Sequence, residues 1–570
     1  MAKPTVHLLD YVAGNIRSLV NAIEKCGYEV EWVKRPEDVK SADKIILPGV
    51  GHFGHCLSSL ASAGYLPAIH AHIQAGKPFF GICVGLQALF SGSEEAPNVP
   101  GLGLIPETLK KFTPKNLGGS RKSVPCIGWN DASTSHHHTN STSNSNSPTR
   151  SFYGLSPKSK YYYVHSYFAP YLPNVLEEAG WTVATAMYGD ESYVGAIGRG
   201  NVFATQFHPE KSGAAGLRVI KAFLDGCEWS DAPTPLTTTQ PMSAKYATTN
   251  NLTHRIIACL DVRTNDSGDL VVTKGDQYDV REKTDSKGVR NLGKPVDMAR
   301  KYYEQGADEV TFLNITSFRD CPVADLPMLE ILRRTSETVF VPLTIGGGIR
   351  DTVDPGTGKE VSALDVAKLY FASGADKVSI GSDAVTAAEE YWAAGGKLCG
   401  RTGIETISAA YGRQAVVVSV DPKRIFVKSP SDTTHTTVKT SLPNADGNEY
   451  VWYACTVRGG RETRDLDVVQ LVTACEAMGA GEILLNAIDR DGQNSGYDLE
   501  LIRMVKQAVE IPVIASSGAG RPVHFEEVFN ATGVDAALGA GMFHRGEYTV
   551  TQVKEYLGGA GMLVRPYEEF

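Results

Sequence analysis

A cysteine with glycines close on both sides is the first group in this sequence that could do chemistry. Cys83 stands in the run G-I-C-V-G-L-Q (81–87), with an apolar stretch (77–80) before it and a helical pattern after it. Strand, tight turn and helix in this order predict a nucleophile elbow, in which the glycines leave room for the turn. A cysteine is also often a small buried apolar residue, so this segment alone leaves the role of Cys83 open.

A histidine and a carboxylate stand two residues apart much later in the chain. His208 and Glu210 lie in the run Q-F-H-P-E-K-S (206–212), directly after an apolar segment (202–204) that predicts a strand. A nucleophilic thiol needs a base, and a histidine base needs a carboxylate that orients it. Cys83, His208 and Glu210 therefore form a candidate triad.

These two runs together resemble the motifs of class I, triad-type glutamine amidotransferases. The resemblance implies that Cys83 is the nucleophile, His208 the general base and Glu210 the group that orients His208. The strand-like run K-Y-Y-Y-V-H-S-Y (160–167) also resembles this family. Strand and helix patterns alternate before the elbow, so we expect a parallel α/β sheet with its site at the C-terminal edge of the strands.

A glycine loop after the third expected strand, P-G-V-G (48–51), is a second candidate part of this site. Attack on a glutamine amide creates an oxyanion, which needs preorganised backbone N–H donors. The resemblance places one donor near Val50 or Gly51 and the other at Val84, and Gln87 matches a position associated with glutamine binding. Without Cys83 nearby, the loop would be interpreted as an ordinary turn.

Residues 131–150 interrupt the α/β pattern with three histidines (136–138) followed by a Ser/Thr/Asn tract. Neither side offers metal-ligand spacing, so we interpret the segment as a low-complexity surface loop. We expect no metal and no cofactor. Residues 230–251 are rich in Thr, Pro and Ser and are interpreted as a linker between a first domain (1–229) and a second (252–570).

The second domain contains an internal repeat. Segments 306–315, 341–348 and 374–381 are similar to segments 479–488, 511–518 and 533–541, and each half opens with an apolar strand that leads to an aspartate, Asp261 or Asp421. Four strands per half predict a (β/α)8 barrel with the two aspartates on opposite sides of its mouth. An aspartate after a strand is also a common turn or cap residue, but two repeat-related carboxylates favour acid–base catalysis.

Glycine-rich strand ends also occur in pairs. One set contains Gly348, Gly381 and Ser382, and the other contains Gly518, Ala540 and Gly541. Backbone N–H groups at such strand ends bind phosphate, so two sets predict a substrate with a phosphate at each end.

The runs A-C-L-D-V, V-V-T-K-G, G-G-G-I-R, A-I-D-R-D-G and S-G-A-G-R resemble the cyclase barrel of the imidazole glycerol phosphate synthases, and the first domain resembles the glutaminase of the same family. The resemblance to the fused enzymes of fungal type implies that ammonia from glutamine reacts in the barrel with N'-phosphoribulosyl formimino-AICAR phosphate (PRFAR). The products are imidazole glycerol phosphate and AICAR ribotide. Asp261 and Asp421 become the acid–base pair, and Lys274 and Asp491 match substrate contacts.

Four charged residues stand at the starts of barrel strands: Arg255, Glu309, Lys377 and Glu482. If they point inward, they form either a salt-bridged gate for ammonia or a structural ion-pair layer, and the two interpretations are compatible. The glutaminase must dock at this end of the barrel, where Lys211 is expected to pair with Asp376 across the interface.

The composition limits the remaining possibilities. The chain has 570 residues, a formal net charge of −9 and ten cysteines without paired spacing. We therefore expect free thiols in a reducing compartment, a cytoplasmic location, no nucleic-acid or membrane partner, and a monomer whose two domains are each other's partners.

Two rival interpretations remain at this stage. A sugar isomerase acting on a formimino-AICAR substrate is also a duplicated barrel with two aspartates, but it needs no ammonia. A glutamine or nucleotide sensor should lack part of the triad, which is complete here. Polar insertions at 351–361 and 429–450 lie on the side of the barrel site and remove no motif residue.

Overall fold

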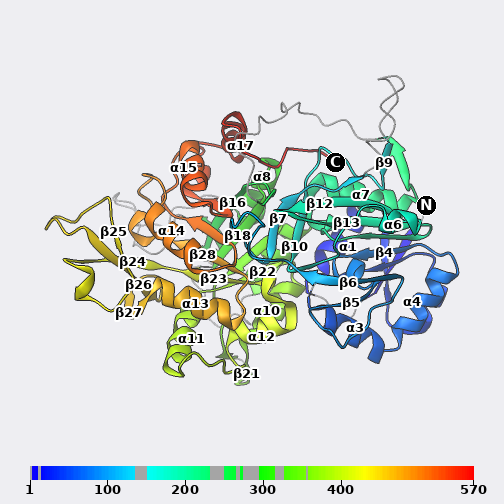
Figure 1. The fold of residues 1–570 in the computed structure, drawn as a ribbon, viewed down its shortest axis with the longest axis horizontal. Helices are drawn as coiled ribbons and strands as arrows, with labels where there is room; N and C mark the ends of the chain where they lie inside the picture. The colour runs from blue at the N-terminus through cyan, green and yellow to red at the C-terminus, as the bar shows by residue number, and fades with distance from the viewer. Residues whose placement is uncertain are drawn as a thin grey trace.

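The computed structural model describes two domains that lie side by side, with the N-terminal domain in blue to cyan and the C-terminal domain in green to red (Figure 1). The described residues are 3–9, 14–49, 51–134, 150–231, 250–264, 270–273, 294–314, 326–354 and 357–570. Val50, Lys274 and most of the predicted linker and of the 131–150 loop lie outside them.

The N-terminal domain is built on one mixed eight-stranded sheet. Its order is β2 (Glu29–Val33), β1 (Thr5–Leu9), β3 (Ile45–Leu47), β4 (Phe79–Ile82), β14 (Val202–Thr205), β13 (Glu191–Arg199), β12 (Thr182–Tyr188) and β8 (Ser133–Thr134). The first five strands are parallel, as predicted. The other pairings are antiparallel, so the prediction of a parallel sheet is wrong for this half. Two short hairpins join β12, β13 and β14, and a short hairpin can connect only antiparallel neighbours.

Helices cover both faces of this sheet. The amphipathic helices α1 (Arg17–Lys25) and α7 (Gly213–Asp225) pack on the face that carries Leu8 and Phe80, whereas α3 (Phe53–Ser62) and α4 (Tyr65–Gln74) pack on the face that carries Leu47 and Phe79. Alternate residues of a strand point to opposite faces, so each strand contributes to both cores. β10 (Tyr161–His165) pairs with β7 (Cys126–Asn130) in a separate two-stranded sheet.

The C-terminal domain is the predicted (β/α)8 barrel. Its strands are β16 (Arg255–Thr264), β18 (Glu309–Asn314), β19 (Leu343–Gly346), β22 (Lys377–Ile380), β23 (Val416–Val420), β28 (Glu482–Asn486), β29 (Val513–Ser516) and β30 (Ala536–Gly539). All neighbours are parallel, and β30 pairs with β16 to close the barrel. Ile257 and Cys259 belong to a small inner apolar cluster, whereas Ile256, Ala258 and Leu260 belong to the large outer core.

Helices form the outer layer of the barrel: α8 (Pro295–Glu304), α9 (Leu326–Ser336), α10 (Ala363–Ala372), α12 (Gly403–Tyr411), α13 (Val468–Met478), α14 (Leu499–Ala508), α15 (Pro522–Thr532) and α17 (Val550–Gly559). Ser362, Thr402, Asp467 and Thr549 begin four of them with capping boxes. Two further helices, α11 (Ser382–Ala393) and α16 (Gly541–His544), directly follow β22 and β30, the repeat-related fourth and eighth strands.

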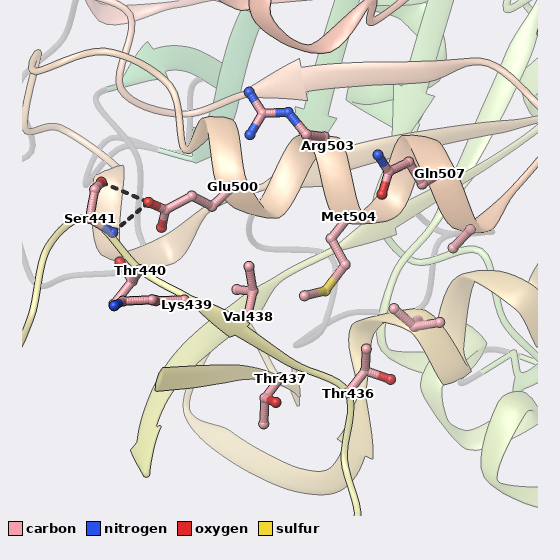
Figure 2. A pocket seen from close by; sticks show the side chains of 12 residues that line it. Thr436, Thr437, Val438, Lys439, Thr440, Ser441, Glu500, Arg503, Met504 and Gln507 are labelled. Carbon is pink, nitrogen blue, oxygen red and sulfur yellow. Dashed lines mark hydrogen bonds between the residues drawn. The ribbon is translucent and has the colours of Figure 1, made fainter. Parts of the chain in front are cut away.

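The two insertions form small sheets of their own. Residues 351–361 contain the hairpin of β20 (Thr352–Val353) and β21 (Glu360–Val361). In the longer insertion, β25 (Thr437–Lys439) joins β24 (Pro422–Val427), β26 (Tyr450–Val457) and β27 (Glu462–Asp467) in the sheet that projects from the left of Figure 1. Figure 2 shows the surface cavity of about 730 Å³ between β25 and α14, where Ser441 donates two hydrogen bonds of 2.7 Å to Glu500. This cavity contains none of the predicted site residues.

Candidate active sites

The predicted elbow is present between β4 and the short helix α5 (Val84–Gln87). Cys83 has a φ of +50° and its N–H donates to the Thr205 carbonyl at 2.7 Å. A Cβ atom on Gly85 would lie 2.3 Å from the Leu47 carbonyl oxygen, and one on Gly81 would lie 2.4 Å from the Gly85 carbonyl oxygen. The two glycines are therefore required because the backbone of the turn approaches itself and β3.

The histidine and the carboxylate meet at the end of the adjacent strand, β14. Nδ1 of His208 lies 2.8 Å from Oε1 of Glu210, and both side chains are buried. A carboxylate can only accept, so the proton is on Nδ1 and Nε2 is left for Cys83. Burial lowers the pKa of His208, but the carboxylate of Glu210 and the contact with Cys83 outweigh burial and hold this pKa well above its ordinary value. The pair is thus arranged to stabilise an imidazolium beside a thiolate.

The glycine loop after β3 lies directly against the elbow. A Cβ atom on Gly49 would lie 2.4 Å from the backbone nitrogen of Val84, and Gly51 has a φ of +124°. Gln87 lies one helical turn after Cys83, and its Nε2 donates to the Tyr167 carbonyl at 3.0 Å. The structure therefore brings Gly51, Val84 and Gln87 to the site of Cys83, as predicted.

A cavity of about 310 Å³ opens beside Cys83 and is lined by both domains. The N-terminal domain contributes Gly51, Val84, Gln87 and Glu95, and the barrel contributes Ser408, Gly412, Arg413, Gln414 and Gly479. Gly479 opens one of the repeat segments, but nothing in the sequence marks Glu95 or these barrel residues as part of this site. The domain packing alone brings them to the cavity.

The mouth of the barrel holds the second site. Asp261 lies in β16, and Asp421 directly follows β23, which is four strands away in either direction around the closed barrel. Asn486 donates from Nδ2 to Oδ1 of Asp421 at 2.8 Å. Burial raises the pKa of Asp421, Asp491 raises it further, and the Asn486 hydrogen bond only partly offsets these effects. Two carboxyl groups in one site can divide acid and base work.

Two of the glycine-rich strand ends have the left-handed backbone conformation that glycine allows in a tight turn. Gly348 and Gly518 have φ values of +73° and +98°. Gly381 precedes α11, which begins at Ser382, and Ala540 precedes α16, which begins at Gly541. The turns of the two sets thus occupy repeat-related positions in the barrel, and their role in phosphate binding stays a prediction.

The four charged side chains predicted at the strand starts form a ring of ion pairs at the opposite end of the barrel. Arg255 contacts Glu309 at 3.2 Å and also pairs with Glu482, and Lys377 lies 2.7 Å from both carboxylates. All four side chains are at most 2% exposed. Burial raises the pKa of Glu482, but Arg255 and Lys377 outweigh burial and lower it. Each residue is the first of its strand, so the ring lies across the bottom of the barrel.

The N-terminal domain docks on this bottom end. Lys211, one residue after Glu210, lies 2.7 Å from Oδ2 of Asp376, and Asn15 donates to the other oxygen of Asp376 at 2.7 Å. Trp129 and Tyr162 of the N-terminal domain pack into the barrel core. The predicted Lys211–Asp376 pair is thus present and connects the triad segment to the start of β22.

Comparison with known proteins covers both domains. Residues 7–226 match the family of class I glutamine amidotransferases, and residues 255–549 match the family of histidine biosynthesis proteins. The chain is 69% identical over 568 residues to the imidazole glycerol phosphate synthase of Emericella nidulans, with 99% of each chain covered. It is 54% identical over 565 residues to that of Schizosaccharomyces pombe, covering 98% of this chain and 99% of the relative.

This chain belongs to the imidazole glycerol phosphate synthase family. Part of the chain also matches a separate subunit: a subunit of the imidazole glycerol phosphate synthase from Haloarcula marismortui is 40% identical over 314 residues, which is 55% of this chain and 99% of the subunit. In this chain, the amidotransferase domain that the triad predicted and the barrel that the sequence repeat predicted are parts of one polypeptide.

Among the residues that the structure describes, no group of three or more His, Cys, Asp or Glu side chains is arranged to hold a metal ion. Within the same residues, no helix is long and apolar enough to cross a membrane.

Proposed function

We infer that this chain is an imidazole glycerol phosphate synthase, which hydrolyses glutamine to glutamate and ammonia and uses the ammonia to convert PRFAR into imidazole glycerol phosphate and AICAR ribotide. One observation carries this inference beyond family membership. A complete Cys–His–Glu triad lies at the bottom of a barrel whose mouth carries two facing aspartates.

At the first site, the thiolate of Cys83 attacks the glutamine amide carbon and His208 donates the proton to the leaving ammonia. The N–H of Val84, with a donor from the 49–51 loop, binds the oxyanion. Gly49 supports this role, because its close approach to Val84 holds the loop at the elbow. Water then releases glutamate from the thioester with His208 as general base.

At the mouth, Asp261 and Asp421 supply the acid and the base that ring closure requires. The two repeat-related strand-end sets bind the two phosphates of PRFAR, with Gly348, Gly381 and Ser382 at one end and Gly518, Ala540 and Gly541 at the other. We also assign substrate contacts to Lys274 and Asp491. The raised pKa of Asp421 supports an assignment of this residue to the proton-donating role.

Ammonia has to travel from Cys83 to the mouth without meeting bulk water, where it would be protonated. The inner apolar cluster of the barrel supports a route along the barrel axis. The ring of Arg255, Glu309, Lys377 and Glu482 lies across its entrance, so one of these pairs must open for passage. We propose that the chain is a monomer, because fusion already joins the two catalytic domains, and that it is located in the cytoplasm.

The replacement Cys83→Ala tests this function. With PRFAR and glutamine, we expect imidazole glycerol phosphate formation to fall by at least about 1,000-fold. With PRFAR and an ammonium salt at alkaline pH, formation should remain close to that of the unaltered chain. If the folded variant fails with both nitrogen sources, the cyclase assignment is wrong, and isomerase activity would be tested next. If the variant still uses glutamine, Cys83 is not the nucleophile.

A further inference from the structure

A further cavity, of about 300 Å³, lies on the side of the barrel where α10, α11 and α12 pack together. These helices are in the lower part of Figure 1. Three isoleucines that are at most 3% exposed, Ile349, Ile380 and Ile404, form the apolar part of its lining. An apolar floor with a few charged groups around it is typical of a site for a small molecule.

The charged residues that line this cavity include one more acid than base: Arg350, Arg401, Asp351, Asp383 and Glu390. Asp351 is already engaged, because it accepts the Ala363 N–H at 2.8 Å. The removal of water by the surrounding protein raises the pKa of Asp383, and the nearby Arg350 offsets only part of this effect. The lining therefore favours a ligand that carries both signs of charge, with one more positive than negative group.

The two acids of α11 lie on one face of this helix. Asp383 and Glu390 are seven residues apart, which is close to two full turns and spans about 10.5 Å along the axis. Carboxylates at this spacing match a ligand whose two positive groups are separated by a flexible stem.

Arg401 contributes the opposite charge from the loop before α12. This loop is held by Glu405, whose carboxylate accepts the backbone N–H groups of Gly400, Arg401 and Thr402 at 2.9, 3.1 and 3.1 Å. Thr402 also begins α12 with a capping box. The backbone of Arg401 is therefore fixed beside the cavity, and its guanidinium has the fork geometry that binds a carboxylate.

We propose that this cavity binds a cationic amino acid, for which L-arginine is the probe. Arg401 binds the carboxylate of the ligand, and Asp383 and Glu390 bind its two positively charged groups. The methylene stem of the ligand lies on the three isoleucines of the floor.

The cavity adjoins the barrel mouth through the chain. Ile349 directly follows Gly348, and Ile380 directly precedes Gly381, so the ligand packs beside strand ends that we assign to a phosphate of PRFAR. None of the residues in the triad or the two catalytic aspartates lines this cavity. The inference therefore adds a ligand to the proposed function and does not depend on it.

Isothermal titration calorimetry of the full chain with L-arginine, at neutral pH and fixed ionic strength, tests this site. We expect a dissociation constant of about 1 mM. Arg401→Met and Glu390→Gln should each raise it by at least about 10-fold, because each removes a charge-assisted contact. Agmatine lacks the carboxylate, so its affinity should not fall in Arg401→Met. L-Leucine lacks the second positive group and should bind at least about 10-fold more weakly than L-arginine.

Lys397→Met is the matched control, because Lys397 is an exposed cation in the same loop that does not line the cavity, and it should keep the affinity of the unaltered chain. The absence of binding heat with L-arginine would overturn the proposal. Binding that survives in both Arg401→Met and Glu390→Gln would also overturn it, because the ligand would then occupy another place, such as the cavity beside Cys83. The titration uses neither glutamine nor PRFAR, so its result is separate from any failure of the proposed function.

Discussion

The side chains of the two sites differ in how their charges are balanced. At the triad, Glu210 and Cys83 more than offset the burial of His208, so the charged form of the imidazole is favoured. At the barrel mouth, the Asn486 hydrogen bond does not offset the burial of Asp421, so the pKa of this carboxyl is raised above its ordinary value. The first arrangement suits a thiolate–imidazolium pair and the second suits an acid.

Replacing Asp421 with asparagine should therefore stabilise the protein while it removes cyclase activity. The folded state holds the Asp421 proton more tightly than the unfolded state, so folding stability decreases as pH rises above about 3.9, the unfolded value. At pH 8 asparagine cannot ionise, so the replacement removes this loss of folding stability. The unfolding temperature should therefore be higher than that of the unaltered chain. PRFAR cyclisation should fall by at least about 100-fold.

The control for this prediction is Asp446→Asn, because Asp446 is exposed. Its unfolding temperature should match that of the unaltered chain at each pH. The increase in unfolding temperature caused by Asp421→Asn should become smaller as the pH is lowered toward 4. A lower unfolding temperature at pH 8 would show that the ionised carboxylate is stabilised, contrary to this interpretation.

Sequence reasoning identified residues whose neighbours along the chain form a motif. Cys83 is surrounded by the glycines that its turn requires, and His208 stands two residues from its partner Glu210. Glu95 and Arg413 were missed because they are isolated charged residues whose common cavity exists only after two domains dock. Asp308 and Asp535, which accept backbone N–H groups of neighbouring barrel strands, did carry a signal, since both stand in the repeated Gly-x-Asp run before a strand.

At the scale of elements, the site around Cys83 is built by close backbone packing. The elbow needs glycine at 81 and 85, and the loop after β3 needs glycine at 49. These contacts hold β3, β4 and α5 as one unit, so the 49–51 loop and Cys83 are positioned together.

Gly85→Ala tests this packing. Its Cβ atom would lie 2.3 Å from the Leu47 carbonyl oxygen, so the loop after β3 has to move away from Cys83. We expect glutamine-dependent activity to fall by about 100-fold or more, with ammonium-dependent cyclisation retained. Gly92→Ala is the matched control, because its Cβ would have no neighbour within 4 Å. Normal glutamine turnover in Gly85→Ala would contradict the requirement for glycine.

Helices and strands could be predicted where the sequence pattern of the segment itself determines the structure. The eight barrel strands could be predicted because a repeat fixes their number and order. The antiparallel half of the glutaminase sheet could not, because strand direction depends on which strands become neighbours. The insertion at 429–450 gave no pattern either, and its contact with α14 arises from tertiary packing (Figure 2).

At the scale of the whole molecule, three repeat-related aspartates organise the docking of the domains. Asp308, Asp376 and Asp535 each accept the backbone N–H of a neighbouring strand. Asp376 also pairs with Lys211 and Asp535 with Ser123, both in the glutaminase domain. Asp308 holds Arg565, whose guanidinium lies 4.3 Å from the ring centroid of Trp129. The fourth copy of this run has glycine at 481 instead, on the side where the glutamine cavity opens.

The cluster around Asp308 makes stability depend on pH. Burial lowers the pKa of Lys554, which pairs with Asp308, to about 7. Between pH 7 and the unfolded lysine value of about 10.4, the unfolded state binds more protons, so Lys554 makes stability rise with pH. In Lys554→Met, the unfolding temperature should therefore rise less between pH 7 and 9 than it does in the unaltered chain. Scanning calorimetry at several pH values would measure this difference.

Lys368→Met is the control, because Lys368 is exposed on α10, and it should keep the pH dependence of the unaltered chain. An unchanged pH dependence in Lys554→Met would mean that Lys554 stays charged in the folded protein across this range.

The central claim is that ammonia made at Cys83 reaches the barrel mouth without leaving the protein. The most direct measurement is the rate of imidazole glycerol phosphate formation in the presence of an efficient enzymatic scavenger of free ammonia. With glutamine, the rate should be unaffected by the scavenger. With Cys83→Ala and an ammonium salt, the same scavenger should suppress the reaction, which shows that it works. Equal suppression of both reactions would mean that ammonia passes through bulk solvent, and the account of the barrel as its route would be wrong.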